Sequence, residues 1–263
     1  MRRFALIAGA LLAIASVPLG VPGFQAEAEA EARSFGTHCQ NDFQDPRLGN
    51  LFAFEVCSRF NTRLAQGATH KFYYDLVGKQ YFWHDTGDQE TNSLEDVDLF
   101  FTMTHGGYNN DLAAYSMWET GVDAETSQMR LGDEGVGTSI LAGAVCKTLH
   151  FDDYTWNRWD SVFKGGLRMA AGSYDMFWWK REDNQVGSRF GTFLNVGHTF
   201  KYAWSAAFNQ TVQPEDPAIM VATGPGVDCD YRRDQMTWDN YESFERLRDD
   251  QADNWCGWYW IDL

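Results

Sequence analysis

The sequence predicts an α/β domain in which helices flank a mostly parallel central sheet. Three observations predict it. Four short apolar runs bounded by Gly, Asp or Pro resemble strands buried on both faces, and they occupy residues 97–104, 138–145, 166–171 and 218–223. Segments with apolar residues at helical spacing alternate with these runs. No Pro/Gly/Ser linker, charge block or fixed-period repeat interrupts residues 36–263, so one domain is favoured over two.

The first predicted element of the domain is a helix. After Pro46 and Gly49, apolar residues recur at helical spacing, at Leu51, Phe54, Cys57, Phe60 and Leu64. An aromatic, strand-like segment follows at residues 71–83. A second helical stretch lies between the last two apolar runs, with one face formed by Phe190, Phe193, Leu194, Gly197, Phe200, Trp204, Ala207 and Phe208. Buried strands that alternate with helices favour a parallel sheet.

The N-terminus has the order of a secretory signal peptide. A basic start at residues 1–3 precedes an apolar run at 4–17, which prolines end before the small and acidic residues 25–32. We expect residues 1–30 to be the signal peptide and residues 31–263 the domain, with cleavage near Ala28, Ala30 or Ala32. The alternative is an N-terminal membrane anchor, although the run is short for a bilayer span. The expected location is therefore secreted or at the cell surface.

Composition excludes two classes of protein. The 11 Trp, 19 Phe and 11 Tyr residues supply enough apolar area for a core, which excludes a disordered chain. Lys and Arg total 21 against 37 Asp and Glu, a net charge of -16. Because phosphate binding requires a basic surface, the chain is not expected to bind nucleic acid nonspecifically.

The chain has five cysteines, an odd number. In an exported protein, four of them are expected to form two disulfides: Cys39, Cys57, Cys229 and Cys256. Four cysteines allow three pairings, which sequence alone does not distinguish. The remaining thiol is Cys146, which directly follows a predicted buried strand.

A histidine occupies the corresponding place after another strand. The run 97–104 leads into His105 and Gly106, as the run 138–145 leads into Cys146. Carboxyl ends of parallel strands share one edge of a sheet, so the two side chains meet there if the strands are neighbours. A thiol needs a base to become a nucleophile, and the Gly106 and Cys146 N–H groups could form an oxyanion hole. The alternative is a buried core thiol and an ordinary His-Gly loop.

This layout resembles the caspase-like cysteine peptidases of clan CD. An apolar strand, His105-Gly106, a gap of about forty residues, and a second apolar strand ending in Cys146 carry the likeness. The chain is most similar to a bacterial family of exported caspase-like proteins of unknown function. The closer likeness rests on residues 100–106, 144–149, 166–172 and the pattern Gly187, Phe190, Gly197, Ala203-Trp204. The resemblance implies a caspase-haemoglobinase-like three-layer sandwich.

The resemblance also implies a mechanism and a substrate. His105 would be the general base and then the acid, Cys146 the nucleophile, and Gly106 an oxyanion donor, acting on a peptide or protein substrate. The caspase signature Gln-Ala-Cys-x-Gly is absent around Cys146, so a preference for aspartate is not expected. A non-catalytic exported protein that binds a peptide, glycan or protein partner is the alternative.

Acidic and aromatic residues on the same edge are candidates for substrate binding. Asp152 and Asp153 follow Cys146, and Asp175 and Trp178 follow the next strand. Such side chains would favour a Lys or Arg of the substrate by charge and by cation–π contact. Solvated loop carboxylates and core tryptophans are the alternative.

No metal or other cofactor is predicted. His38, His70 and His84 lack the spacings typical of zinc sites. The acidic segments 85–88 and 228–230 could bind calcium outside the cell, but neither has EF-hand spacing, so solvated loops are favoured. The aromatic C-terminal segment 255–260 brackets a predicted disulfide cysteine and is expected to seal the core.

Overall fold

The computed structural model describes residues 33–40, 51–74, 97–116, 123–132, 137–211, 216–247 and 254–260. The predicted signal peptide lies outside the described residues, as do His84, the acidic segment 85–88 and most of the predicted strand at 71–83. Within the described ranges, no helix is long and apolar enough to cross a bilayer.

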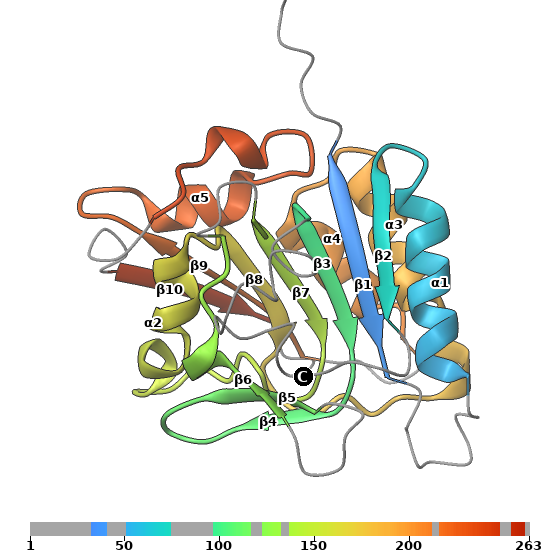
Figure 1. Cartoon of the computed structure of the whole chain (residues 1–263), viewed down its shortest axis with the longest axis horizontal. Helices are drawn as coiled ribbons and strands as arrows, with labels where there is room; N and C mark the ends of the chain where they lie inside the picture. The colour runs from blue at the N-terminus through green and yellow to red at the C-terminus, as the bar shows by residue number, and fades with distance from the viewer. Residues whose placement is uncertain are drawn as a thin grey trace, which may run out of the picture. The chain divides into compact units, whose positions relative to one another are not determined.

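A seven-stranded sheet forms the centre of the domain, in the order β10-β9-β8-β7-β3-β1-β2 (Figure 1). Strands β2, β1, β3, β7 and β8 are mutually parallel, whereas β9 runs antiparallel to both β8 and β10. The strands are β1 (Ser34–Cys39), β2 (Thr69–Tyr74), β3 (Leu99–Met103), β7 (Ile140–Ala144), β8 (Met169–Ser173), β9 (Pro217–Thr223) and β10 (Asn254–Tyr259). The prediction of an α/β domain with a mostly parallel sheet is confirmed.

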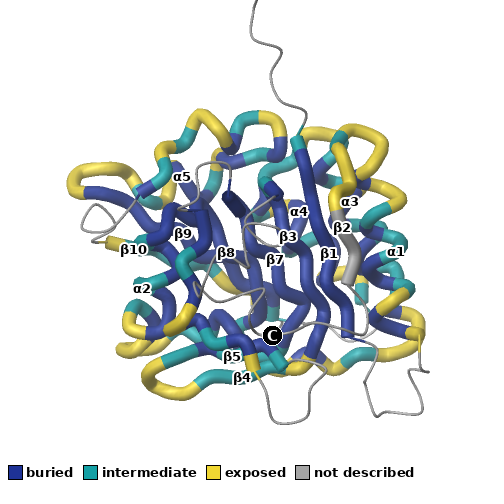
Figure 2. Tube along the Cα trace, viewed as in Figure 1, coloured by how far each residue is buried: buried dark blue, intermediate teal, exposed yellow. Residues whose placement is uncertain are grey.

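Helices cover one face of this sheet and a helix with a small sheet covers the other. Helices α1 (Phe52–Leu64), α3 (Val186–Asn195) and α4 (Phe200–Phe208) share a hydrophobic core with one face of the strands. Helix α2 (Thr155–Gly165) packs against the other face, together with the antiparallel strands β4 (Gly106–Tyr108), β5 (Ala113–Ser116) and β6 (Asp123–Glu125). The result is a three-layer α/β sandwich, in which β1, β3, β7, β8 and β9 are buried along their length (Figure 2).

The core between the sheet and α1, α3 and α4 is aromatic. The Phe60 ring stacks on Phe101 at 4.6 Å and on Phe190 at 5.6 Å between centroids. Trp204 meets Phe190 edge-on at 4.9 Å and donates its indole N–H to the Gly172 carbonyl at 2.8 Å. Aromatic pairs of this geometry stabilise a core beyond their buried area, by about 0.5–1.5 kcal/mol each.

The predicted helical stretch at 190–208 is two helices. Gly197 adopts φ +82, a conformation that glycine tolerates and that ends α3. Thr199 then caps α4 by accepting a hydrogen bond from the Tyr202 N–H at 3.2 Å. Apolar spacing alone does not reveal this break, because the residues of both helices face the same core.

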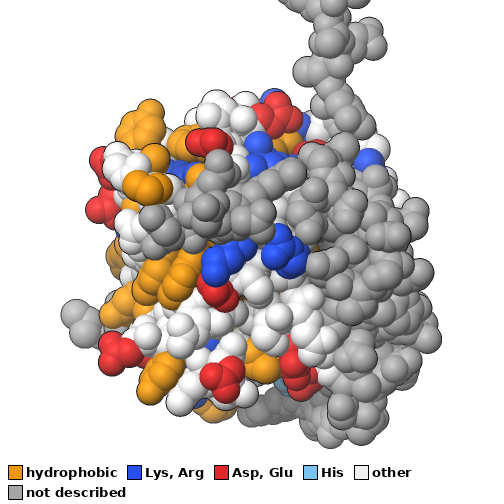
Figure 3. All heavy atoms as spheres, turned by 60° about the vertical axis from the view of Figure 1, so that its left-hand side comes forward, with side chains coloured by type: hydrophobic (Ala, Val, Ile, Leu, Met, Phe, Trp, Pro, Cys, Tyr) orange, Lys and Arg blue, Asp and Glu red, His pale blue; other side chains and the backbone are white. Residues whose placement is uncertain are grey.

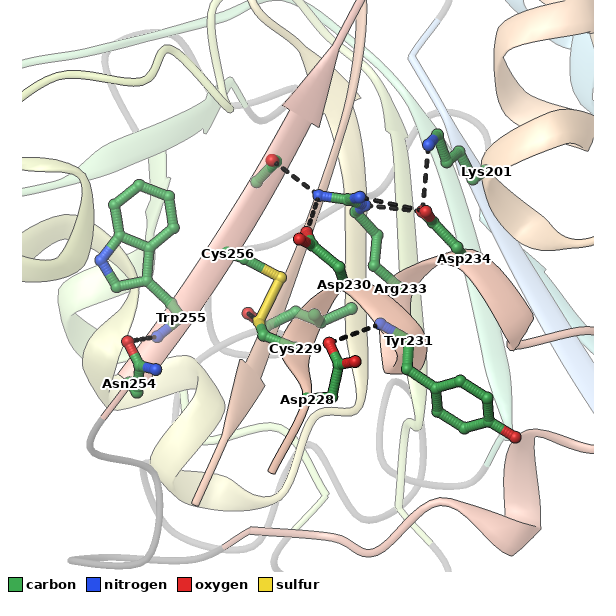
Figure 4. The surroundings of a disulfide bond; sticks show 12 residues. Lys201, Asp228, Cys229, Asp230, Tyr231, Arg233, Asp234, Asn254, Trp255 and Cys256 are labelled. Atoms are coloured by element: carbon green, nitrogen blue, oxygen red, sulfur yellow. Dashed lines mark hydrogen bonds and ion pairs between the residues drawn. A yellow bond between two sulfur atoms is a disulfide. The ribbon is translucent and has the colours of Figure 1, made fainter. Parts of the chain in front are cut away.

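Both disulfides join the four cysteines predicted for them, and the structure selects the pairing. Cys39–Cys57 ties the end of β1 to α1, and Cys229–Cys256 ties the short helix α5 (Cys229–Gln235) to β10 (Figure 4). Cys146 takes part in neither disulfide. The aromatic C-terminal segment forms β10, a half-exposed strand at the end of the sheet, whose Trp255 and Trp258 pack against the two core clusters.

Candidate active site

His105 and Cys146 lie at the ends of neighbouring parallel strands. The β3–β7 ladder runs in register from Leu99–Ile140 to Met103–Ala144. His105 and Cys146 each follow two residues after that last pair. The two strands are therefore neighbours, which the sequence analysis left open, and both residues lie at the carboxyl edge of the sheet, where ligands bind in open α/β sheets.

Cys146 belongs to the face of the sheet that packs under α1, α3 and α4. Residues of β3 and β7 that pack under α1, α3 and α4 are Leu99, Phe101, Met103, Ile140, Ala142 and Ala144. Both strands end there, and Cys146 is the first residue of a turn. Cys146 indeed packs against this core and is half-buried, whereas His105 is exposed. Adjacent strands lie about 4.8 Å apart, so the backbone segments that carry the two residues leave the sheet side by side.

The backbone after His105 turns into the hairpin of β4 and β5. The His105 carbonyl accepts the Ser116 N–H at 2.8 Å, and Asn109 donates its N–H to the Leu112 carbonyl at 2.9 Å. Hydrogen-bonded pairs alternate in an antiparallel ladder, so the intervening Gly106 directs its N–H away from β5. The N–H group of Gly106 is thus not used to pair with β5.

Gly106 brings the hairpin directly against the residue that precedes Cys146. A Cβ atom at this position would lie 2.3 Å from Val145 Cγ1 and 2.4 Å from the Ala114 carbonyl oxygen. Both distances are shorter than any side chain tolerates, so the approach requires glycine. A Cβ at Gly107, by contrast, would meet nothing within 4 Å.

The loop after β8 contacts Cys146 and the residue that follows it. The Phe177 N–H donates to the Cys146 sulfur at 3.4 Å, and the Lys147 N–H donates to the Asp175 carbonyl at 3.0 Å. The Cys146 thiol in turn lies 3.9 Å from the Phe177 carbonyl, to which it donates, so the sulfur contacts both backbone groups of Phe177. Phe177 itself is buried in the core beneath this loop.

Lys147 has an unusual backbone. Its φ of 56° is the one positive value at a non-glycine residue in the described part of the chain. Such a conformation costs free energy at a non-glycine residue, and it is concentrated at functional sites. The strained residue directly follows Cys146, where it turns the chain toward Asp175.

The predicted substrate-binding residues lie in two segments: Asp175 and Trp178 follow β8, and Asp152 and Asp153 follow β7. Asp175 and Trp178 are in the loop that contacts Cys146. The Asp175 carboxylate lies 3.4 Å from the Lys147 ammonium with 53% of its side chain exposed, and Trp178 is 61% exposed. Asp153 is exposed after β7.

Asp152 has a structural partner that the sequence did not reveal. Its carboxylate lies 2.8 Å from the guanidinium of Arg158, a fully buried side chain on α2. Burial opposes ionisation of Asp152, but hydrogen bonds from Arg158 and the Tyr154 N–H outweigh it and lower the pKa of the carboxyl. This contact is on the α2 face of the sheet, opposite the face on which Cys146 packs. The signal available in the sequence was the Asp152-x-x-Thr155 pattern, since Thr155 Oγ1 accepts the Asp152 N–H at 2.7 Å at the start of α2.

A second contact missed from the sequence braces the loop after β8. Arg181 forms a two-pronged ion pair with Glu55 of α1, and Asn184 donates to the same carboxylate at 2.6 Å. The Arg181 hydrogen bond is the main reason why the pKa of Glu55 lies below its usual value. The pair is partly exposed, so its contribution to stability is small, but it fixes where the loop joins the helical layer.

The residues considered for metals have other partners. Asp228 caps α5 by accepting the Tyr231 N–H at 3.0 Å, and Asp230 pairs with Arg233 at 2.7 Å (Figure 4). The buried His38 contacts Thr102 Oγ1 through Nδ1 at 3.2 Å, and the His70 ring stacks on Phe35. Across the described ranges, no group of three or more His, Cys, Asp and Glu residues could hold a metal ion.

The protein is thus a three-layer α/β domain in which a histidine and a cysteine follow adjacent parallel strands at the carboxyl edge of the central sheet. The chain belongs to the family described as "Domain of unknown function (DUF6345)", whose model matches residues 47–262. The match includes His105, Gly106 and Cys146 and begins after Cys39. No curated protein matches the chain.

Proposed function

We propose that this protein is an exported cysteine peptidase, or a related acyl-transfer hydrolase, that uses a His105/Cys146 dyad. One observation carries the proposal. His105 and Cys146 each follow by two residues an in-register pair of adjacent parallel strands, at the carboxyl edge of the sheet. The resemblance to caspase-like peptidases, which rests on these same residues, supports the assignment.

In the first half-reaction, His105 takes the proton of the Cys146 thiol and the sulfur attacks the carbonyl carbon of the substrate. The new C–S bond places negative charge on the carbonyl oxygen, which the N–H groups of Gly106 and Cys146 stabilise.

Collapse of this intermediate breaks the C–N bond, and protonated His105 gives its proton to the leaving amine. His105 then takes a proton from water, which attacks the thioester carbon. Cleavage of the C–S bond releases a carboxylic acid, and the returned proton restores the thiol. No oxidant, reductant or cofactor enters the balance.

We infer that the substrate contributes a Lys or Arg side chain next to the scissile bond. Asp175 and Trp178 are exposed in the loop that contacts the Cys146 sulfur, and together they offer a carboxylate, which also pairs with Lys147 at 3.4 Å, and an aromatic face. The charge of Asp152, by contrast, is compensated by Arg158. In a peptide panel, cleavage after Lys or Arg should fall about tenfold or more in Asp175→Asn. Cleavage only after other residues would contradict the assignment.

Labelling with an electrophilic peptide probe tests the dyad. The unaltered protein should be labelled rapidly at Cys146, Cys146→Ala not at all, and His105→Ala at least about a hundredfold more slowly, since a positioned base contributes that much. His70→Ala is a matched control, because it removes an exposed imidazole that lies on β2. Equal labelling in the unaltered protein and both site variants would refute a catalytic dyad.

That negative result would favour the alternative, a binding protein without catalysis. Exposed aromatic side chains around β10 and α5 are the observation on its side: Tyr231 is 62% exposed, Trp260 41% and Tyr259 39%. Figure 3 shows hydrophobic side chains gathered on the face that carries β10 and α2. Aromatic surfaces of this kind are enriched at binding sites.

Export is the remaining part of the proposal. The N-terminal pattern of basic, apolar and small residues and the two disulfides support it. Mass spectrometry of the exported protein should find an N-terminus between residues 29 and 33. A chain that retains residues 1–28 in the membrane fraction would support the anchor instead.

A further inference from the structure

We propose that Arg158 is a positioning residue. It fixes the β4–β5 hairpin, which follows His105 and is called the His105 hairpin, relative to residues 147–154, which follow Cys146 and are called the Cys146 loop. This inference rests on the proposed dyad. His105 precedes the β4–β5 hairpin, while Cys146 precedes the loop that leads into α2. A side chain that hydrogen-bonds to both segments therefore influences the distance between His105 and Cys146.

The Arg158 guanidinium contacts both segments. One terminal nitrogen donates to the carbonyl of Asn109, in the turn of the β4–β5 hairpin, at 3.3 Å. The other donates to the carbonyl of His150, four residues after Cys146. Asp152, in the same loop, supplies the compensating charge at 2.8 Å. The side chain is 0% exposed, so solvent does not replace these contacts when they are lost.

Stacked rings extend the same connection. The Arg158 guanidinium lies 4.7 Å over the ring of Tyr108, which is on β4. Tyr108 stacks on His150 at 4.7 Å, and His150 stacks on Tyr174 at 4.7 Å with its Nδ1 3.0 Å from the Tyr174 carbonyl. The rings of the hairpin, the Cys146 loop and the segment after β8 thus form one column that begins at Arg158.

Arginine is required at this position by geometry. Its planar fork of donors reaches two carbonyls and a carboxylate at once, and its flat face packs on an aromatic ring. A lysine has one ammonium on a flexible chain and cannot hold both segments in this way. Arg158→Lys therefore keeps the charge opposite Asp152 while it releases the hairpin.

Alkylation of Cys146 by iodoacetamide between pH 5 and pH 10 tests the proposal without a known substrate. In the unaltered protein, reaction below pH 7 should depend on His105 and disappear in His105→Ala. Arg158→Lys should lose at least about tenfold of this low-pH rate and keep the rate at pH 10, where the thiol ionises by itself. Asp152→Asn, which weakens the anchor of the guanidinium without removing it, should give an intermediate profile.

Arg168→Lys is the matched control. Arg168 is also a buried arginine that donates to a carbonyl, that of Phe244 at 2.6 Å, but it precedes β8 at the opposite edge of the sheet. Its alkylation profile should equal that of the unaltered protein. A folded Arg158→Lys with an unchanged profile would overturn this proposal, as would an equal loss in Arg168→Lys. If Arg158→Lys fails to fold, an unchanged profile in Asp152→Asn would overturn it. A profile that His105→Ala leaves unchanged would instead refute the dyad, and this inference with it.

Discussion

Gly106 and Gly107 are consecutive residues with opposite tolerance for a side chain. A Cβ at Gly106 would collide with Val145 and Ala114, whereas one at Gly107 would enter open space. The difference arises because the close approach of β4 to the end of β7 occurs at Gly106 alone. The sequence shows two identical residues after His105, so the distinction depends on the packing around them.

Gly106→Ala should therefore impair the site while Gly107→Ala does not. The collision should lower the free energy of unfolding by about 1–3 kcal/mol or more and slow probe labelling of Cys146 by pushing the hairpin away. Thermal unfolding and labelling kinetics measure both effects. Equal stability and equal labelling rates in the two alanine variants would show that the close contact of Gly106 with Val145 and Ala114 is not required for the site.

The buried His38 should make stability depend on pH. Burial lowers its pKa from 6.5 to about 4, so the folded protein keeps the ring neutral. As the pH falls from 6.5 to 4, the unfolded chain gains a proton that the folded chain does not, and stability falls by about 3 kcal/mol; below pH 4 this effect levels off. His38→Asn should lose this part of the pH dependence in denaturant unfolding. His70→Asn, at an exposed position, should keep it.

Helices α1 and α3 pack unusually closely. A Cβ at Gly187 of α3 would lie 2.0 Å from the Val56 carbonyl of α1, so the two backbones meet at that point. This contact brings Phe190 against Phe60 in the helical layer that covers the face on which Cys146 packs. The sequence analysis marked Gly187 only as part of a family-like pattern, because contact between helices is not visible in apolar spacing.

Gly187→Ala should separate the two helices and lower the free energy of unfolding by about 1–3 kcal/mol or more. Thr192→Ala is the control, since Thr192 is exposed on the same helix and its hydroxyl bonds only within α3. Denaturant titration followed by tryptophan fluorescence compares them. An equal change in both variants would contradict the close-packing argument.

At the scale of the whole molecule, each disulfide ties a helix to a strand of the central sheet. Cys39–Cys57 spans 18 residues and Cys229–Cys256 spans 27, which joins α5 to the edge strand β10. Cross-links stabilise a fold mainly by restricting the unfolded chain. Neither bridge uses Cys146, so both are structural in relation to the proposed chemistry.

The paired variant Cys229→Ser, Cys256→Ser should lower the free energy of unfolding by about 2–4 kcal/mol and leave probe labelling of Cys146 intact at low temperature. Chemical denaturation and labelling on the same sample check this expectation. Complete loss of labelling in the folded variant would mean that the bridge shapes the site, contrary to the expectation.

Local patterns in the sequence determined the four buried runs, the helix that contains Phe60, the cysteines of the disulfides and the positions of His105 and Cys146 after their strands. Each of these features depends on residues that are close in the chain, so residue type and the spacing of apolar residues are enough to predict it. The tertiary structure alone decided that β3 and β7 are adjacent and in register, how the cysteines pair, and that the stretch 190–208 breaks at Gly197. It also decided that Asp152 meets Arg158 and not the Cys146 face. These outcomes depend on residues far apart in the chain, and packing of the whole core selects them.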